Sequence, residues 1–247
     1  MDKITSGIID KLSLIGFFNV ILSGGIILYG SSPLINEYAP GLLYVRLGVE
    51  EDFEKVVVII LLCFVIGSIL QGFQRLLFKN VKSKIVTRCL SDMVQADDEV
   101  LKKGVLSNKY QREGVIKMAE KLFKDKNLGP FDPTDASMAG YFFNYCENSN
   151  SIKGYSGRAS KSSEAANFYE QLAVAFYMLA VIGVLATVFG TSNVLIYSVG
   201  FFALGGVLTG MAYNSRMNWA KAVLSTYEVV TDIENARRRM IRKTMVK

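Results

Sequence analysis

Two long apolar runs separated by a short polar break dominate the pattern of the chain. Residues 172–190 and 194–213 contain no charged side chain, and only Thr191, Ser192 and Asn193 lie between them. Each run is about 19–20 residues long, the length that an α-helix needs to cross about 30 Å of hydrocarbon. Because so short a connection makes neighbouring helices antiparallel, the pattern predicts a transmembrane hairpin at 168–213.

Two more apolar segments lie in an N-terminal membrane region that we place at 1–78. The first, residues 14–30, is uncharged, and the second, residues 56–78, begins apolar and becomes polar on one face. A predicted outer loop at 31–55 joins them. Together with the hairpin, these segments predict an all-α fold with four transmembrane helices in two antiparallel pairs.

The remaining sequence predicts helical cytoplasmic extensions at 79–167 and 214–247. In the first extension apolar residues recur at helical spacing, and we expect helices near 110–125 and 136–146. The segment 147–163 is rich in Ser, Asn and Gly, which predicts a loop before the helix that leads into the hairpin.

The C-terminal extension contains neither Gly nor Pro after Tyr213, so its helix should continue to about Arg242. Apolar residues form a short heptad-like seam along this helix. The seam can pack on the helix before the hairpin or on its copy in a neighbouring chain. Its members are Trp219, Val223, Tyr227, Val230 and Ile233.

Charged residues predict how the chain is oriented. The sequence has 28 Lys and Arg residues against 22 Asp and Glu residues, a net charge of +6. Cations follow the second apolar segment directly, and a second cluster, Arg237, Arg238 and Arg239, lies near the C-terminus. Because cytoplasmic segments carry an excess of Lys and Arg, the pattern predicts that both termini and the 79–167 region lie in the cytoplasm.

Polar side chains on the first two apolar segments are the candidate pore-lining residues. Asn19 and Ser23 lie one helical turn apart, and Ser68, Gln71 and Arg75 recur at spacings of three and four. Each set has two interpretations. The side chains either bond neighbouring helices, with Arg75 extending to the membrane surface, or they line a water-filled path in an oligomer.

The composition argues against an enzyme. The chain has no histidine, which removes the usual general base and the commonest zinc ligand. The three cysteines, Cys63, Cys89 and Cys146, form no CxxC motif and are expected to be free thiols. The sequence predicts no catalytic residue, no metal site and no cofactor.

Two basic groups are candidates for an anionic ligand. Lys153, Arg158 and Lys161 lie among glycines and hydroxyl residues, although these glycines follow no phosphate-binding spacing. The cluster Arg237–Arg239 either contacts anionic lipid or binds a phosphate-rich ligand. Membrane lipid is an expected partner in the first case.

The layout from Phe142-Phe143-Asn144-Tyr145-Cys146 through Glu164 and Phe168-Tyr169 into the hairpin resembles small bacterial membrane proteins of antiphage defence systems. Within that group the chain is most similar to the channel effector of Hailong-type systems. The resemblance implies a multimeric inner-membrane channel that a nucleic-acid ligand holds closed. It also implies that a partner nucleotidyltransferase makes this ligand, and that the channel opens during infection and depolarises the cell.

The sequence therefore predicts a homo-oligomeric ion channel of the bacterial inner membrane that is gated from the cytoplasm. Under the resemblance, the ligand-binding residues would be Lys153, Arg158 and Lys161, with Arg237–Arg239 as the second choice. The alternative is a non-conducting membrane anchor or scaffold for a soluble partner, which would have ordered cytoplasmic helices and a closed membrane region.

Overall fold

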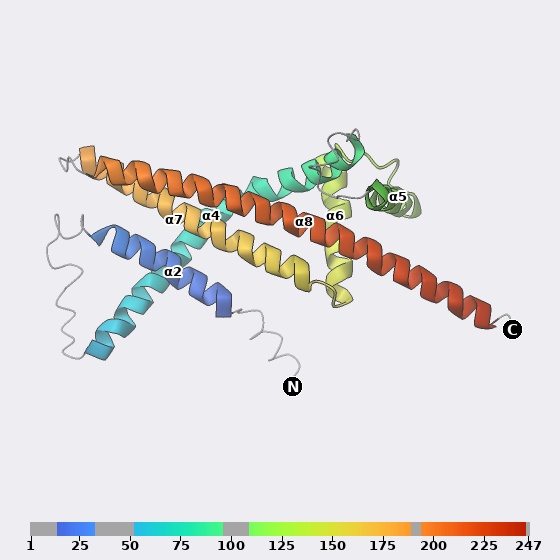
Figure 1. Cartoon of the computed structure of the whole chain (residues 1–247), viewed down its shortest axis with the longest axis horizontal. Coiled ribbons are helices and arrows are strands. Elements are labelled where there is room, and N and C mark those ends of the chain that lie inside the picture. Colours follow the sequence, from blue (N-terminus) through green and yellow to red (C-terminus); the bar gives the residue numbers. More distant parts are fainter. Residues whose placement is uncertain (1–13, 33–51, 96–108, 189–193, 246–247) are drawn as a thin grey trace. The chain divides into compact units, whose positions relative to one another are not determined.

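The computed structural model of the protein describes residues 14–32, 52–95, 109–188 and 194–245. Within these ranges the chain is all-helical (Figure 1), as the sequence predicts. The helices are α2 (Leu14–Gly30), α4 (Asp52–Gln95), α5 (Lys109–Asp125), α6 (Ala136–Ile152), α7 (Gly157–Val188) and α8 (Leu195–Met245). Most of the predicted outer loop lies outside the described residues.

Three of these helices are long and apolar enough to cross a membrane. They are the segments Val56–Leu90 of α4, Gly157–Val188 of α7 and Leu195–Arg237 of α8. Helix α2 is apolar but has only 17 residues, which is about the shortest length that spans hydrocarbon. These helices support the prediction of a membrane protein.

The helix boundaries follow the sequence pattern closely at several places. Helix α2 coincides with the first predicted segment, and α5 begins one residue before the helix predicted near 110–125. Helix α8 continues without interruption from the apolar run to Met245, so the expected long C-terminal helix is confirmed.

The loop that the sequence predicts at 147–163 is wrong. Helix α6 continues to Ile152 and α7 begins at Gly157, so only residues 153–156 of this segment are outside a helix. Asp135 caps the start of α6 by accepting hydrogen bonds from the backbone N–H groups of Ser137 and Met138. Asn150 and Ala159 are buried, so this polar segment has a packed face that its composition does not reveal.

The chain forms two compact units. The membrane unit comprises Met1–Lys79 and Glu164–Tyr213, and the aromatic unit comprises Asn80–Ser163 and Asn214–Lys247. Helices α4, α7 and α8 each contain a boundary between the two. Every contact described below lies within one unit.

Helices α2 and α4 of the membrane unit meet at two glycines. A Cβ atom on Gly24 would collide with the carbonyl oxygen of Cys63, and one on Gly67 would collide with that of Val20. Only glycine permits so close an approach of two backbones. Leu70, Val174 and Ala175 form a buried cluster that joins α4 to α7.

The aromatic unit is built around large buried side chains. The rings of Phe143 and Trp219 lie 4.7 Å apart, and Phe142 contacts Tyr227 edge to face at 6.3 Å. Trp219 and Tyr227 of the C-terminal seam therefore pack on α6 of their own chain. Ile233 of the same seam remains exposed.

Candidate functional site

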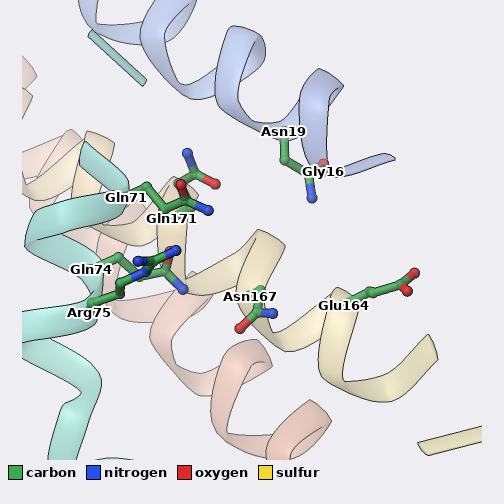
Figure 2. A pocket seen from close by; sticks show the side chains of 8 residues that line it. All are labelled: Gly16, Asn19, Gln71, Gln74, Arg75, Glu164, Asn167 and Gln171. Carbon is green, nitrogen blue, oxygen red and sulfur yellow. The ribbon is translucent and has the colours of Figure 1, made fainter. Parts of the chain in front are cut away.

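The membrane unit contains a polar cavity of about 190 Å³ between α2, α4 and α7 (Figure 2). This volume is far above the roughly 10–15 Å³ that one water molecule requires. Amide side chains dominate the lining, together with one guanidinium and one carboxylate. The lining residues are Gly16, Asn19, Gln71, Gln74, Arg75, Glu164, Asn167 and Gln171.

Two polar stripes on different helices form most of the cavity wall. On α4, Gln71, Gln74 and Arg75 follow the strongly apolar stretch that begins at Val56, at helical spacing. On α7, Glu164, Asn167 and Gln171 recur at spacings of three and four and precede the apolar run that begins at Leu172. Each stripe therefore lies at one end of its helix's apolar segment. Asn19 of α2 adds a third side of the wall (Figure 2).

A buried carboxylate is bonded to the α4 stripe. Nε2 of Gln74 donates a hydrogen bond of 2.9 Å to Oε2 of Glu170, and these residues are only 6% and 2% exposed. A hydrogen bond between buried groups is electrostatically stronger than one in water, because the local dielectric is low. The pair therefore joins α4 to α7 directly beside the cavity.

Gln171 makes the second polar connection, and it involves three helices. Its Nε2 donates to Oγ of Ser23 at 2.9 Å and to the carbonyl oxygen of Gly67 at 3.2 Å. Ser23 is fully buried, and its hydroxyl donates to the carbonyl oxygen of Val20 at 3.0 Å. These bonds close the cavity on the side of the α2–α4 crossing.

The five predicted pore-lining residues occupy three different places. Asn19, Gln71 and Arg75 line the cavity. Ser23 does not line the cavity, and its hydroxyl accepts a hydrogen bond from Gln171 of α7. Ser68 is exposed, does not line the cavity, and donates its hydroxyl proton to the carbonyl oxygen of Phe64 at 2.8 Å.

Sequence reasoning missed the α7 side of this site. Glu164, Asn167 and Gln171 show the same three-and-four spacing that singled out the α4 stripe, and this signal was available. Glu170 lies two residues before an uncharged run of membrane-spanning length. An ionisable residue in such a position is a candidate functional residue by default.

The chemistry of the cavity suits water and hydrated ions. Its amides offer both donors and acceptors, so they can replace part of a hydration shell without a fixed preference for one charge. Among the described residues, no group of three or more Cys, Asp or Glu side chains is placed to hold a metal ion. The cavity is thus a polar, solvent-compatible compartment inside an apolar unit.

The predicted ligand-binding residues do not form one site around a loop. Lys153 caps the end of α6, and its Nζ lies 2.7 Å from Oε1 of Glu234 on α8. Arg158 and Lys161 are exposed in the first turns of α7, and Arg237 is exposed on α8. Arg238 and Arg239 belong to α8, but their side chains lie outside the described residues.

All three cysteines are free and buried. Burial raises the pKa of the Cys146 thiol well above its ordinary range, which makes this thiol a weak nucleophile.

The chain was compared with family models, with curated proteins and with solved structures, and none of them matches.

Proposed function

We propose that the protein is a homo-oligomeric ion channel of the bacterial inner membrane that is gated from the cytoplasm. The observation that carries this proposal is the polar cavity at one end of the apolar segments of α4 and α7. Buried amides and a carboxylate inside a membrane unit are costly, and they are retained where ions, water or protons must pass. Asn19, Gln71 and Arg75 would form the cytoplasmic mouth of the pathway.

The proposed topology has four spans in two antiparallel pairs. The α2–α4 crossing supports one pair, because Val20 lies at Gly67 and Gly24 lies at Cys63, so residue numbers rise on one helix as they fall on the other. For α7 and α8, Tyr177 bonds Thr209 at 3.0 Å while Gly183 lies against Ser198. The excess of cations after the second span supports a cytoplasmic position for the cavity end.

Gating would act through the two polar connections beside the cavity. The Gln74–Glu170 bond and the bonds of Gln171 hold α7 against α4 and α2. Helices α4, α7 and α8 continue into the aromatic unit, so a change in that unit can reach the cavity along continuous helices. Opening would separate the helices at these bonds and hydrate the cavity.

The proposed biological role is that of an antiphage effector that depolarises the membrane. This part rests on the resemblance to Hailong-type effectors and on the exposed cations of the aromatic unit. An oligonucleotide, made by a partner nucleotidyltransferase, would hold the channel closed. Arg158 and Lys161 are the better candidates to contact it, because Lys153 is already paired with Glu234.

Ion flux from sealed liposomes containing the purified protein tests this proposal. We expect flux from the protein alone and suppression of that flux by short DNA oligomers. Flux that the oligomers leave unchanged would retain the channel and remove the nucleic-acid ligand. No flux at any voltage or salt concentration would contradict the channel.

The ligand site is tested by replacing Arg158 and Lys161 together with Ala. For single-stranded DNA, log affinity falls linearly as log salt concentration rises, and each phosphate contact makes this slope steeper by roughly 0.7. The double variant should therefore bind more weakly and with a shallower slope. Replacing two exposed lysines of α5, Lys117 and Lys121, is the matched control. An unchanged slope in the Arg158 and Lys161 variant would remove this site.

A specific observation also favours the scaffold alternative. The cavity ends at the bonds of Gln171, and the cluster of Leu70, Val174 and Ala175 lies beside it. This packing beside the cavity is compatible with a membrane region that stays closed, as the scaffold alternative requires. Absence of flux combined with capture of a soluble partner by the aromatic unit would support this function.

A further inference from the structure

The last part of α8 has an apolar stripe whose side chains are exposed among the described residues. Val229, Ile233 and Met240 are 52%, 59% and 65% exposed. Ala236, which lies between them on the helix, is also exposed. Burial of α8 against its own unit effectively ends at Val230, which is 5% exposed. The stripe lies in the aromatic unit, where large apolar side chains are otherwise mostly buried.

The spacing of these residues is that of a coiled-coil seam. From Val229 through Ile233 and Ala236 to Met240 the steps are four, three and four, which place Ile233 and Met240 at heptad position a and the other two at position d. This seam differs from the buried one, because Trp219, Val223 and Val230 pack within their own chain. Side chains with this heptad spacing can pack between those of a second helix that has the same spacing.

Charges beside the stripe specify the direction of the partner helix. In this register Asp232 occupies position g and Arg237 occupies position e of the following heptad, and both are exposed. In a parallel coiled coil, position g faces position e of the partner's next heptad, so Asp232 of each chain would face Arg237 of the other. An antiparallel pair would instead bring like charges together, Asp232 against Asp232 and Arg237 against Arg237.

We propose that Val229–Met240 of α8 forms a parallel coiled coil with the same segment of other copies of this chain. Copies inserted in one membrane share one orientation, so their C-terminal helices are parallel, as the charges require. The seam is shorter than the three to four heptads that a free coiled coil usually needs. Tethering in the membrane raises the effective concentration of the segments and offsets this shortness.

The proposal rests on the homo-oligomer of the proposed function, but it does not require conduction. It names the surface through which copies associate outside the span region. The competing occupant is an anionic membrane surface, which the neighbouring arginines could also contact. That surface would cover the stripe without bringing two copies together.

Cysteine crosslinking of the full-length protein in membrane vesicles tests the seam. Ala236→Cys and Met240→Cys place a thiol in the seam, and Asn235→Cys places one on the same turn but outside it. Mild oxidation should give at least fivefold more disulfide-linked dimer from either seam variant than from Asn235→Cys. The unmodified chain, whose three cysteines are buried, should give none.

Two results would overturn the proposal. Equal yields at all three positions would indicate random collision between chains. No dimer at any position, with the seam thiols protected from a water-soluble maleimide only when anionic lipid is present, would assign the stripe to the membrane surface. Ion flux measured on the same vesicles tests the coiled coil and the channel separately. Seam dimers without flux would support the coiled coil and contradict the channel.

Charge reversal provides an independent test of direction. In the Ala236→Cys background, Asp232→Arg alone or Arg237→Asp alone brings like charges together and should lower the dimer yield at low salt. The double variant restores opposite charges between chains and should recover the yield. If the double variant gives less dimer than both single variants, the parallel register is wrong.

Discussion

The two units of this protein hold their helices together by opposite means. In the membrane unit the helices meet at glycines and buried amides, and large apolar side chains such as Leu61, Leu76 and Phe202 point outward. In the aromatic unit Trp219 and Phe142 are buried instead. The difference follows from the solvent, because water drives apolar side chains inward whereas lipid does not.

This comparison explains where the cavity lies. A unit whose outer surface is apolar must satisfy its polar side chains internally, and the Gln74–Glu170 and Gln171–Ser23 bonds do so beside the cavity. In the aromatic unit, charged side chains are instead mostly exposed, and ion pairs such as Lys82–Glu147 lie at the surface. Polar side chains thus bond to one another inside the membrane unit, whereas in the aromatic unit charged side chains lie mostly at the surface.

Trp219→Ala should have the largest effect on stability, and it should act on the aromatic unit. Removing a fully buried large aromatic side chain costs about 3–5 kcal/mol. Because burial raises the pKa of Cys146 and shields it, this thiol reports opening of the unit. Maleimide labelling of the Cys146 peptide should become much faster in Trp219→Ala and stay slow in Tyr155→Ala, which alters an exposed side chain. Equal labelling rates would contradict the proposed core.

Gly67→Ala should have the next largest effect, and it should act on the membrane unit. The added Cβ would meet backbone of α2, which cannot move aside as a flexible side chain can. Overpacking of this kind costs about 1–3 kcal/mol. Gly72→Ala on the same helix is the control, since its Cβ meets nothing within 4 Å. Thermal unfolding in detergent should show a lower midpoint for Gly67→Ala alone.

Gln171→Leu should have a smaller effect on stability, because hydrogen bonds between membrane helices average only about 0.6 kcal/mol. Ser23 retains its bond to the carbonyl oxygen of Val20, so no hydroxyl is left without a partner. We expect a slightly lower unfolding midpoint than in the unmodified protein. A loss as large as that of Gly67→Ala would mean that amides, and not close backbone approach, dominate the membrane unit.

Removal of the Lys153–Glu234 ion pair should have the smallest effect. Both side chains are partly exposed, and such pairs contribute about 0–1 kcal/mol and weaken with salt. A double-mutant cycle with Lys153→Ala and Glu234→Ala should give a coupling energy within this range at low salt and near zero at about 1 M salt. A larger, salt-independent coupling would indicate a structural role.

The sequence predicted the helices better than it predicted the cavity. Apolar runs bounded by polar residues predicted α2 and the apolar parts of α7 and α8, because the length of an apolar run can be read from the local sequence. The polar helix ends at 147–163 were missed, because burial of Asn150 and Ala159 depends on distant partners. The spacing on α4 identified Gln71 and Arg75, and the same spacing marks Glu164, Asn167 and Gln171 on α7. That the two stripes face one cavity depends on the tertiary arrangement and could not be predicted from either helix alone.

Single-channel recording of the purified protein in planar bilayers tests the central claim most directly. The unmodified protein should give discrete currents, and Gln71→Leu should change their amplitude, because it replaces a polar cavity wall with an apolar one. Phe73→Leu, an exposed position on the same helix, should leave the amplitude unchanged. Identical currents from all three proteins would contradict the assignment of this cavity to the ion pathway, and absence of current would contradict the channel itself.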